Sequence, residues 1–139
     1  MAKAVLRGYI AYKLSETSRE ALLERFPAAY ARAICSHITY RFDVPQETPL
    51  PPVPKSVLVI GCANDQRGVQ ALVVSVDGAE ERPQPLAGRF HITQSLADGR
   101  SAVESNDVIK QGWRRLQEPV AVQVEPVWIA FEVRRQIGR

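Results

Sequence analysis

The sequence contains little cysteine, no block of basic residues and no long hydrophobic run. Its two cysteines, Cys35 and Cys62, lie far apart, which excludes a C-x-x-C motif, and their apolar surroundings predict small buried thiols. No apolar stretch has the length that spans a bilayer, and Arg7 interrupts the apolar run that a secretory signal would need. We therefore expect a soluble cytoplasmic protein with no membrane partner, and no protein partner is indicated.

Positive charge is present but dispersed. The formal net charge is +3, and the densest basic pairs are Arg114-Arg115 and Arg134-Arg135. This charge is compatible with a phosphate-bearing ligand, although an ordinary solvated surface explains it better. With 45% hydrophobic and 24% charged residues, the composition is that of one globular domain over residues 1–139.

Histidine is scarce, and its distribution is informative. There are two histidines, and both open the same tripeptide: His37-Ile38-Thr39 and His91-Ile92-Thr93. Histidine suits proton transfer near neutral pH better than any other side chain. Because the whole histidine content falls in two copies of one polar–apolar–polar pattern, the pattern indicates two equivalent halves of one site.

Runs rich in β-branched and aromatic residues predict most of the strands. These runs cover residues 5–14, 34–42, 56–62, 69–76 and 89–96. The tail over 120–134 should form one or two strands, interrupted at Pro126 because proline lacks the backbone N–H that a strand donates. Five prolines between residues 45 and 54 predict an extended surface connector.

Two helices are expected among these strands. Thr17 and Glu20 have the spacing of a capping box and predict the start of a helix that Pro27 ends. A second helix is expected over residues 101–115, with Trp113 facing inward. Hairpin-like links and the lack of enough crossover helices for a parallel sheet predict an α+β fold of mainly antiparallel sheets. We expect two lobes, each centred on one His-Ile-Thr strand.

The two tripeptides should each present a histidine and a threonine on one face of a strand. Side chains alternate along a strand, so His37 and Thr39 point the same way while Ile38 turns into the core. The second tripeptide repeats this arrangement. Two such strands facing one cleft would surround an anion with two imidazoles and two hydroxyls.

Such a four-point site suits phosphoester chemistry. One neutral histidine can take a proton from an attacking water while the other, protonated, donates to the leaving oxygen. Two threonine hydroxyls can hydrogen-bond the non-bridging phosphate oxygens and stabilise charge in the transition state. Which histidine is the base and which the acid stays open at this point, because the two halves are equivalent.

The paired His-x-Thr pattern resembles the 2H phosphoesterase superfamily, which includes RNA 2′,3′-cyclic phosphodiesterases. The resemblance implies a bilobal α+β domain with a pseudo-twofold axis and a central cleft. It also implies that His37 and His91 are the acid–base pair and that Thr39 and Thr93 bind phosphate. The residue after each threonine is usually apolar in the superfamily, whereas this chain has Tyr40 and Gln94.

Four residues near the motifs are further candidates for substrate contacts. Arg41 and Arg89 share strand parity with the motif histidines, so we expect them at the rim, although ordinary solvated arginines would look the same. Tyr12 and Tyr40 are candidates for stacking on a base. Tyrosines that merely pack with a wet hydroxyl would give the same sequence pattern.

The expected function is hydrolysis of a nucleotide or RNA phosphoester without a metal or other cofactor, with a 2′,3′-cyclic phosphate as the foremost substrate. One alternative is hydrolysis of a cyclic or 2′–5′-linked oligonucleotide signal, and another is a non-catalytic module that binds RNA or nucleotides. A zinc site would need a third ligand beyond the two histidines. Asp43 and Cys35 lie near the first motif, but no carboxylate or thiol closely follows the second.

Overall fold

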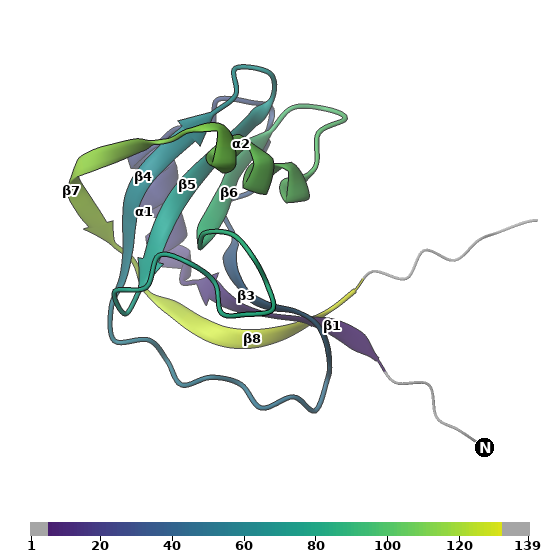
Figure 1. Cartoon of the computed structure of the whole chain (residues 1–139). Helices are drawn as coiled ribbons and strands as arrows, with labels where there is room; N and C mark the ends of the chain where they lie inside the picture. Colours follow the sequence, from purple (N-terminus) through teal and green to yellow (C-terminus); the bar gives the residue numbers. More distant parts are fainter. Residues whose placement is uncertain (1–5, 132–139) are drawn as a thin grey trace, which may run out of the picture.

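Eight strands form one sheet in the computed structural model, which describes residues 6–131. The strands are β1 (Arg7–Leu14), β2 (Arg32–Ala33), β3 (His37–Pro45), β4 (Val57–Asn64), β5 (Val69–Val76), β6 (His91–Leu96), β7 (Arg114–Ala121) and β8 (Val124–Ala130). Their order is β7-β4-β5-β6-β3-β1-β8, and β2 pairs with β6 (Figure 1). The neighbouring strands pair antiparallel, which confirms the α+β class with a mainly antiparallel sheet.

Two helices lie on opposite sides of the β4–β5–β6 part of the sheet: α1 (Glu16–Arg25) and α2 (Ser105–Gln111) (Figure 1). The side chains of β5 alternate between two hydrophobic clusters. Leu72 belongs to the cluster that contains Leu22 of α1, whereas Val73 belongs to the cluster that contains Val108 of α2. Because each face of β5 is covered, its sequence is apolar almost throughout.

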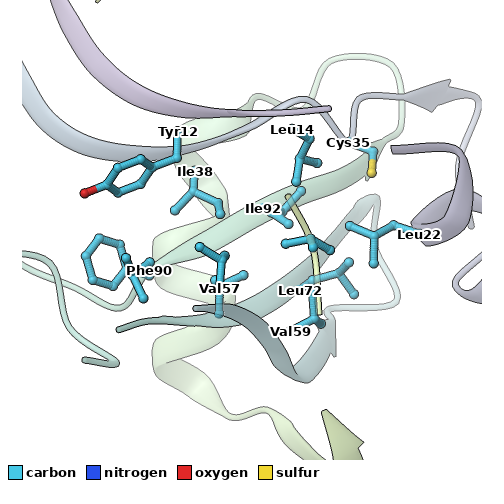
Figure 2. Packing of buried hydrophobic residues seen from close by; sticks show 13 residues of the cluster. Tyr12, Leu14, Leu22, Cys35, Ile38, Val57, Val59, Leu72, Phe90 and Ile92 are labelled. Atoms are coloured by element: carbon cyan, nitrogen blue, oxygen red, sulfur yellow. The ribbon is translucent and has the colours of Figure 1, made fainter. Parts of the chain in front are cut away.

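The two His-Ile-Thr strands meet at the middle of the sheet. β3 pairs with β6 through Ile38 opposite Ile92, and Figure 1 shows β1, β3 and β8 running beneath β4, β5 and β6. Both isoleucines are fully buried, and Figure 2 shows them in the core with Leu14 and Leu72. The central residue of each motif therefore holds the two parts of the sheet together.

The helix expected over residues 101–115 is shorter than predicted. A 3₁₀ turn (Ala102–Glu104) leads into α2, which ends at Gln111, and Gly112 follows with a φ of 150° that glycine tolerates. The chain then enters β7, so Trp113 is not on a helix. Its half-buried ring still packs against the cluster that contains Val108, so it faces inward as expected, and it also contacts the guanidinium groups of Arg89 and Arg115, 5.2 and 4.8 Å from the ring centroid.

The N-cap of the first helix lies two residues before the predicted one. Ser15, and not Thr17, is its N-cap, because the Ser15 hydroxyl accepts a hydrogen bond from the Ser18 N–H at 3.1 Å. The strand expected over 34–42 begins only at His37, as β3. Residues 34–36, which follow the short β2, are not in a strand, and Cys35 among them has a φ of 41°, in the left-handed region. Cys35 is buried as expected, but Cys62 is half-buried.

Pro126 does not interrupt a strand. β8 runs through it, and the break falls before Val124, between β7 and β8. Both are edge strands of the sheet, where a residue without an N–H is tolerated. Residue 5, residues 132–134 and the Arg134-Arg135 pair lie outside the described residues. No helix over residues 6–131 has the length and apolar character needed to cross a bilayer.

Candidate functional site

Both His-x-Thr motifs line one pocket, with a volume of about 360 Å³. We call it the junction pocket, because His37 and Thr39 come from β3 and His91 and Thr93 from β6, the two strands that meet there. Its lining combines strand, loop and helix residues. They are Tyr9, Ile34, Ser36, His37, Thr39, Phe42, Arg82, Leu86, His91, Thr93, Ala102, Val103 and Asn106.

Strand alternation places the motif side chains on the pocket side of the sheet. Ile38 and Ile92 point into the core with α1, so the residues on either side of each isoleucine point the other way. This is the arrangement expected from the sequence. The pairing of Ile38 with Ile92 fixes the register of β3 against β6, and this register places the two histidines and two threonines side by side.

A β-bulge follows each motif. Opposite β1, the partners in β3 change from Thr39 to Arg41, and Tyr40 is the extra residue. Opposite β5, the partners in β6 change from Thr93 to Ser95, so Gln94 is extra. A bulge inserts one extra residue, so the side chains beyond it point to the opposite face of the sheet from the one that simple alternation predicts.

The first bulge explains why the predicted rim arginine lies elsewhere. Beyond Tyr40 the parity is reversed, so Phe42 lines the junction pocket in the place expected for Arg41, which is exposed outside the lining. Arg89 is also outside the lining, and its guanidinium forms an ion pair with Glu80 at 3.0 Å.

The two tyrosines predicted to stack on a base also lie outside the junction pocket. Tyr12 is 4% exposed and belongs to the hydrophobic core, and its ring centroid lies 5.3 Å from that of Tyr40. Both side chains border a separate hollow beside Phe90. The structure thus gives these tyrosines a packing role.

Gln94 has a structural use that explains a polar residue after the second motif. It is fully buried, and its Nε2 donates to the Phe26 carbonyl at 2.9 Å and to the Leu22 carbonyl at 3.3 Å. These carbonyls lie at the C-terminal end of α1, where the Leu22 carbonyl also accepts from the Phe26 N–H and the Phe26 carbonyl, at the C-cap, is beyond the helical ladder. The glutamine therefore ties α1 to the strand that carries His91.

The hydrogen bonds of the two imidazoles differ. His91 Nδ1 lies 2.9 Å from the carbonyl oxygen of Arg89, which can only accept, so Nδ1 carries the proton. In the neutral ring, His91 Nε2 is then left with a free lone pair. His37 Nδ1 lies 2.7 Å from the Ser36 hydroxyl, which can donate or accept and therefore permits either tautomer.

Both histidines are poorer proton acceptors than exposed histidines. Burial lowers the pKa of His37 below its ordinary value of 6.5. Burial is also the main cause that lowers the pKa of His91. The hydrogen bond to the Arg89 carbonyl opposes this shift, and the positive charges of Arg82 and protonated His37 add to it. The pKa of His91 therefore depends on the protonation state of His37.

The two motif hydroxyls have different surroundings. Thr93 is 8% exposed, and its Oγ1 lies 2.9 Å from the Ser105 Oγ at the start of α2. Within residues 6–131, the Thr39 hydroxyl forms no hydrogen bond, so it is free to donate to a ligand. Thr93 Oγ1 also donates to the Ala102 carbonyl at 3.4 Å, so it donates to a ligand only when its hydrogen leaves this long bond and Ser105 is the donor of their shared bond.

Nine of the thirteen lining residues were not predicted as site residues, among them Tyr9, Phe42 and Arg82. Tyr9 and Phe42 form an aromatic side of the pocket, with ring centroids 6.3 Å apart, and the Tyr9 ring is 5.5 Å from that of His37. Arg82 enters from the loop between β5 and β6. Strand parity would have identified Phe42 only if the bulge were known, and Arg82 lies in an irregular segment with no periodic pattern.

The residues near the first motif that could have supplied a third metal ligand are placed apart. Asp43 pairs with Arg7 at 2.9 Å on an exposed part of β3, and Cys35 is buried next to the Arg19 carbonyl. Over residues 6–131, no group of three or more His, Cys, Asp or Glu side chains is arranged to hold a metal ion.

Comparisons with known proteins bear on none of these residues. No family model, curated protein or solved structure matches the chain. The interpretation of the junction pocket therefore depends on the two His-x-Thr motifs and on the geometry that brings them together.

Proposed function

We propose that the protein is a phosphodiesterase that uses two histidines and no metal ion to open a 2′,3′-cyclic phosphate on a nucleotide or an RNA end. The observation that carries the proposal is that both histidines of the chain and both motif threonines line one pocket. The two free thiols suit a reduced compartment, so the proposal places the activity in the cytoplasm.

The proposal includes the two-lobed, pseudo-twofold arrangement of the 2H phosphoesterases. β6 belongs to the β7-β4-β5-β6 part of the sheet and β3 to the β3-β1-β8 part. Each motif strand has its bulge directly after the threonine, at Tyr40 and at Gln94. An antiparallel pair with Ile38 opposite Ile92 has a local twofold axis at that point, and this axis supports a pseudo-twofold relation between the two parts of the sheet.

We assign the base to His91 and the acid to His37. His91 Nε2 has the lone pair, and the positive charge of Arg82 disfavours the protonated ring. His91 Nε2 takes a proton from water as the water oxygen bonds to phosphorus. The bond from phosphorus to one ribose oxygen breaks, and that oxygen takes the proton of His37, leaving a phosphomonoester.

The pocket lining favours an anionic nucleotide over a neutral ligand. Among the lining residues, Arg82 is permanently charged, and none of them is a carboxylate. Tyr9 and the 56% exposed Phe42 offer aromatic surface beside the histidines, on which a base can stack. The Thr39 and Thr93 hydroxyls lie in the same lining and can donate to non-bridging phosphate oxygens.

Hydrolysis should persist when divalent metals are removed. We expect the purified protein to convert 2′,3′-cyclic AMP to a single monoester with equal rates before and after dialysis against EDTA, because every proposed proton transfer uses a histidine. Separation of the products by chromatography checks the result. Loss of activity with EDTA and recovery with zinc would contradict the proposal.

The same assay separates the alternatives. Preferred turnover of a cyclic or 2′–5′-linked oligonucleotide over 2′,3′-cyclic AMP would identify an oligonucleotide signal as the substrate. The two-histidine mechanism would stay the same. Saturable binding of all these ligands without turnover of any would identify a non-catalytic binding module.

Activity should be greatest in mildly acidic solution. The base must be neutral and the acid protonated, so kcat/KM follows a bell-shaped curve whose maximum lies between the two pKa values of the free protein. Because burial lowers both histidine pKa values below 6.5, we expect the maximum below pH 6.5. Rates measured from pH 4.5 to 9 test this, and a maximum above pH 8 would contradict it.

A further inference from the structure

Arg82 is a buried arginine without a carboxylate partner. It is 9% exposed, and no Asp or Glu side chain among residues 6–131 lies within ion-pair distance of it. Arginine is almost never buried this far unless a negative charge or a full set of acceptors compensates for the lost hydration. The Arg82 Nε is buried and has no hydrogen-bond partner.

The loop between β5 and β6 is built around this guanidinium. Nη2 donates to the Ala87 carbonyl and to the Asn106 Oδ1 of α2, the latter at 2.9 Å, and the Arg82 N–H donates to the Gly88 carbonyl. A Cβ on Gly88 would lie 2.7 Å from Nη2, so the glycine leaves the space that the guanidinium occupies. Its φ of 104° also disfavours any larger residue.

Both side-chain hydrogen bonds of Arg82 come from one nitrogen, Nη2. Nη2 is the nitrogen that the protein engages, whereas Nε lacks an acceptor and the residue lines the junction pocket beside His91. The guanidinium is thus held rigidly and its positive charge is left uncompensated within the described residues. Nη1 forms no hydrogen bond within residues 6–131 and is not among the buried unpaired atoms, so it can donate to a phosphate oxygen, and the guanidinium charge strengthens that bond.

We propose that Arg82 is the phosphate-binding cation of the junction pocket, and that it recognises the non-bridging oxygens of a phosphate ester held between His37 and His91. The inference deepens the proposed function and rests on it for the identity of the ester. It requires a substrate whose reacting phosphate group carries a negative charge. It also adds a charged partner to the two threonines, which supply neutral donors.

The test uses inorganic phosphate as a probe that needs no turnover. We expect the wild-type protein to bind phosphate in isothermal titration, and the Arg82→Gln variant to bind it about tenfold more weakly or worse, since a charge-assisted pair is lost. Arg67→Gln is the matched control, because Arg67 is an exposed arginine of the β4–β5 hairpin outside the junction pocket. Its phosphate affinity should equal that of the wild type.

A measurement on the unmodified protein keeps the inference testable if Arg82→Gln does not fold. In nitrogen-15 NMR spectra, the Arg82 Nε–H resonance should move on titration with phosphate, while that of Arg67 should stay in place. An unchanged Arg82 resonance at saturating phosphate would overturn the inference, as would equal phosphate affinity in wild type and Arg82→Gln.

The proposed function can fail separately. If wild-type protein binds phosphate through Arg82 but hydrolyses no phosphodiester, the anion site stands and the enzymatic proposal falls. If 2′,3′-cyclic AMP is hydrolysed with dependence on both histidines while Arg82→Gln changes neither KM nor phosphate affinity, hydrolysis stands and the role of Arg82 falls.

Discussion

Replacing either histidine should reduce kcat for 2′,3′-cyclic AMP by about 10²- to 10⁴-fold, the contribution of a positioned general acid or base. Glutamine is the suitable replacement at both positions, because it keeps polarity and approximate size but cannot transfer a proton near neutral pH. The double variant His37→Gln/His91→Gln should be little worse than either single variant, since the two groups act in one step. Steady-state rates of the three variants provide the measurement.

A substrate with a good leaving group separates the two roles. A p-nitrophenyl phosphodiester expels p-nitrophenolate, which needs no proton, so His37→Gln should regain most of its activity on it while His91→Gln should not. Recovery in the His91 variant instead would reverse the assignment of base and acid. Wild-type turnover in both single variants, with circular dichroism showing native folds, would end the catalytic interpretation of the motifs.

Replacing Ile92 with alanine should lower the free energy of unfolding by about 2–5 kcal/mol, the usual cost of truncating a fully buried isoleucine. Ile92 is 0% exposed, pairs with Ile38 and packs in the cluster with Leu72. Truncation leaves a cavity at the place where the two parts of the sheet meet. Urea denaturation followed by circular dichroism measures the loss.

The control for this substitution is Val53→Ala. Val53 is 63% exposed in the proline-rich connector, so its truncation should change the free energy of unfolding by less than about 0.5 kcal/mol. Equal stability of Ile92→Ala and Val53→Ala would show that the β3–β6 pairing is not part of the core. We also expect a lower kcat in folded Ile92→Ala, because the isoleucine fixes the position of His91 relative to His37 on the neighbouring strand.

Local patterns in the sequence were sufficient for most of the strands and for the α+β class. The runs that formed β4 and β5 are apolar over consecutive residues, and such runs mark a strand covered on both faces. The predicted range of the second helix was too long, because Trp113 and Leu116 continue the helical spacing of apolar residues beyond Gly112. That glycine ends α2, and pairing with β4 then decides that residues 114–121 form a strand.

The pocket residues divide in the same way. Strand alternation depends only on the local backbone, so the shared face of His37 and Thr39 could be deduced from their spacing. The position of Phe42 depends on an extra residue in β3 opposite β1, which is a property of the pairing and not of either strand alone. Arg41 was therefore assigned to the wrong face.

The sequence by itself determined the chemical groups of the candidate site and the face of each strand that carries them. Those features follow from residue type and from a period of two, both of which are local. Only the tertiary structure decided that β3 and β6 are neighbours, that Ile38 meets Ile92, and that Arg82 enters the same pocket. These facts depend on contacts between segments distant in the chain, where burial and hydrogen bonding of the whole domain select the arrangement.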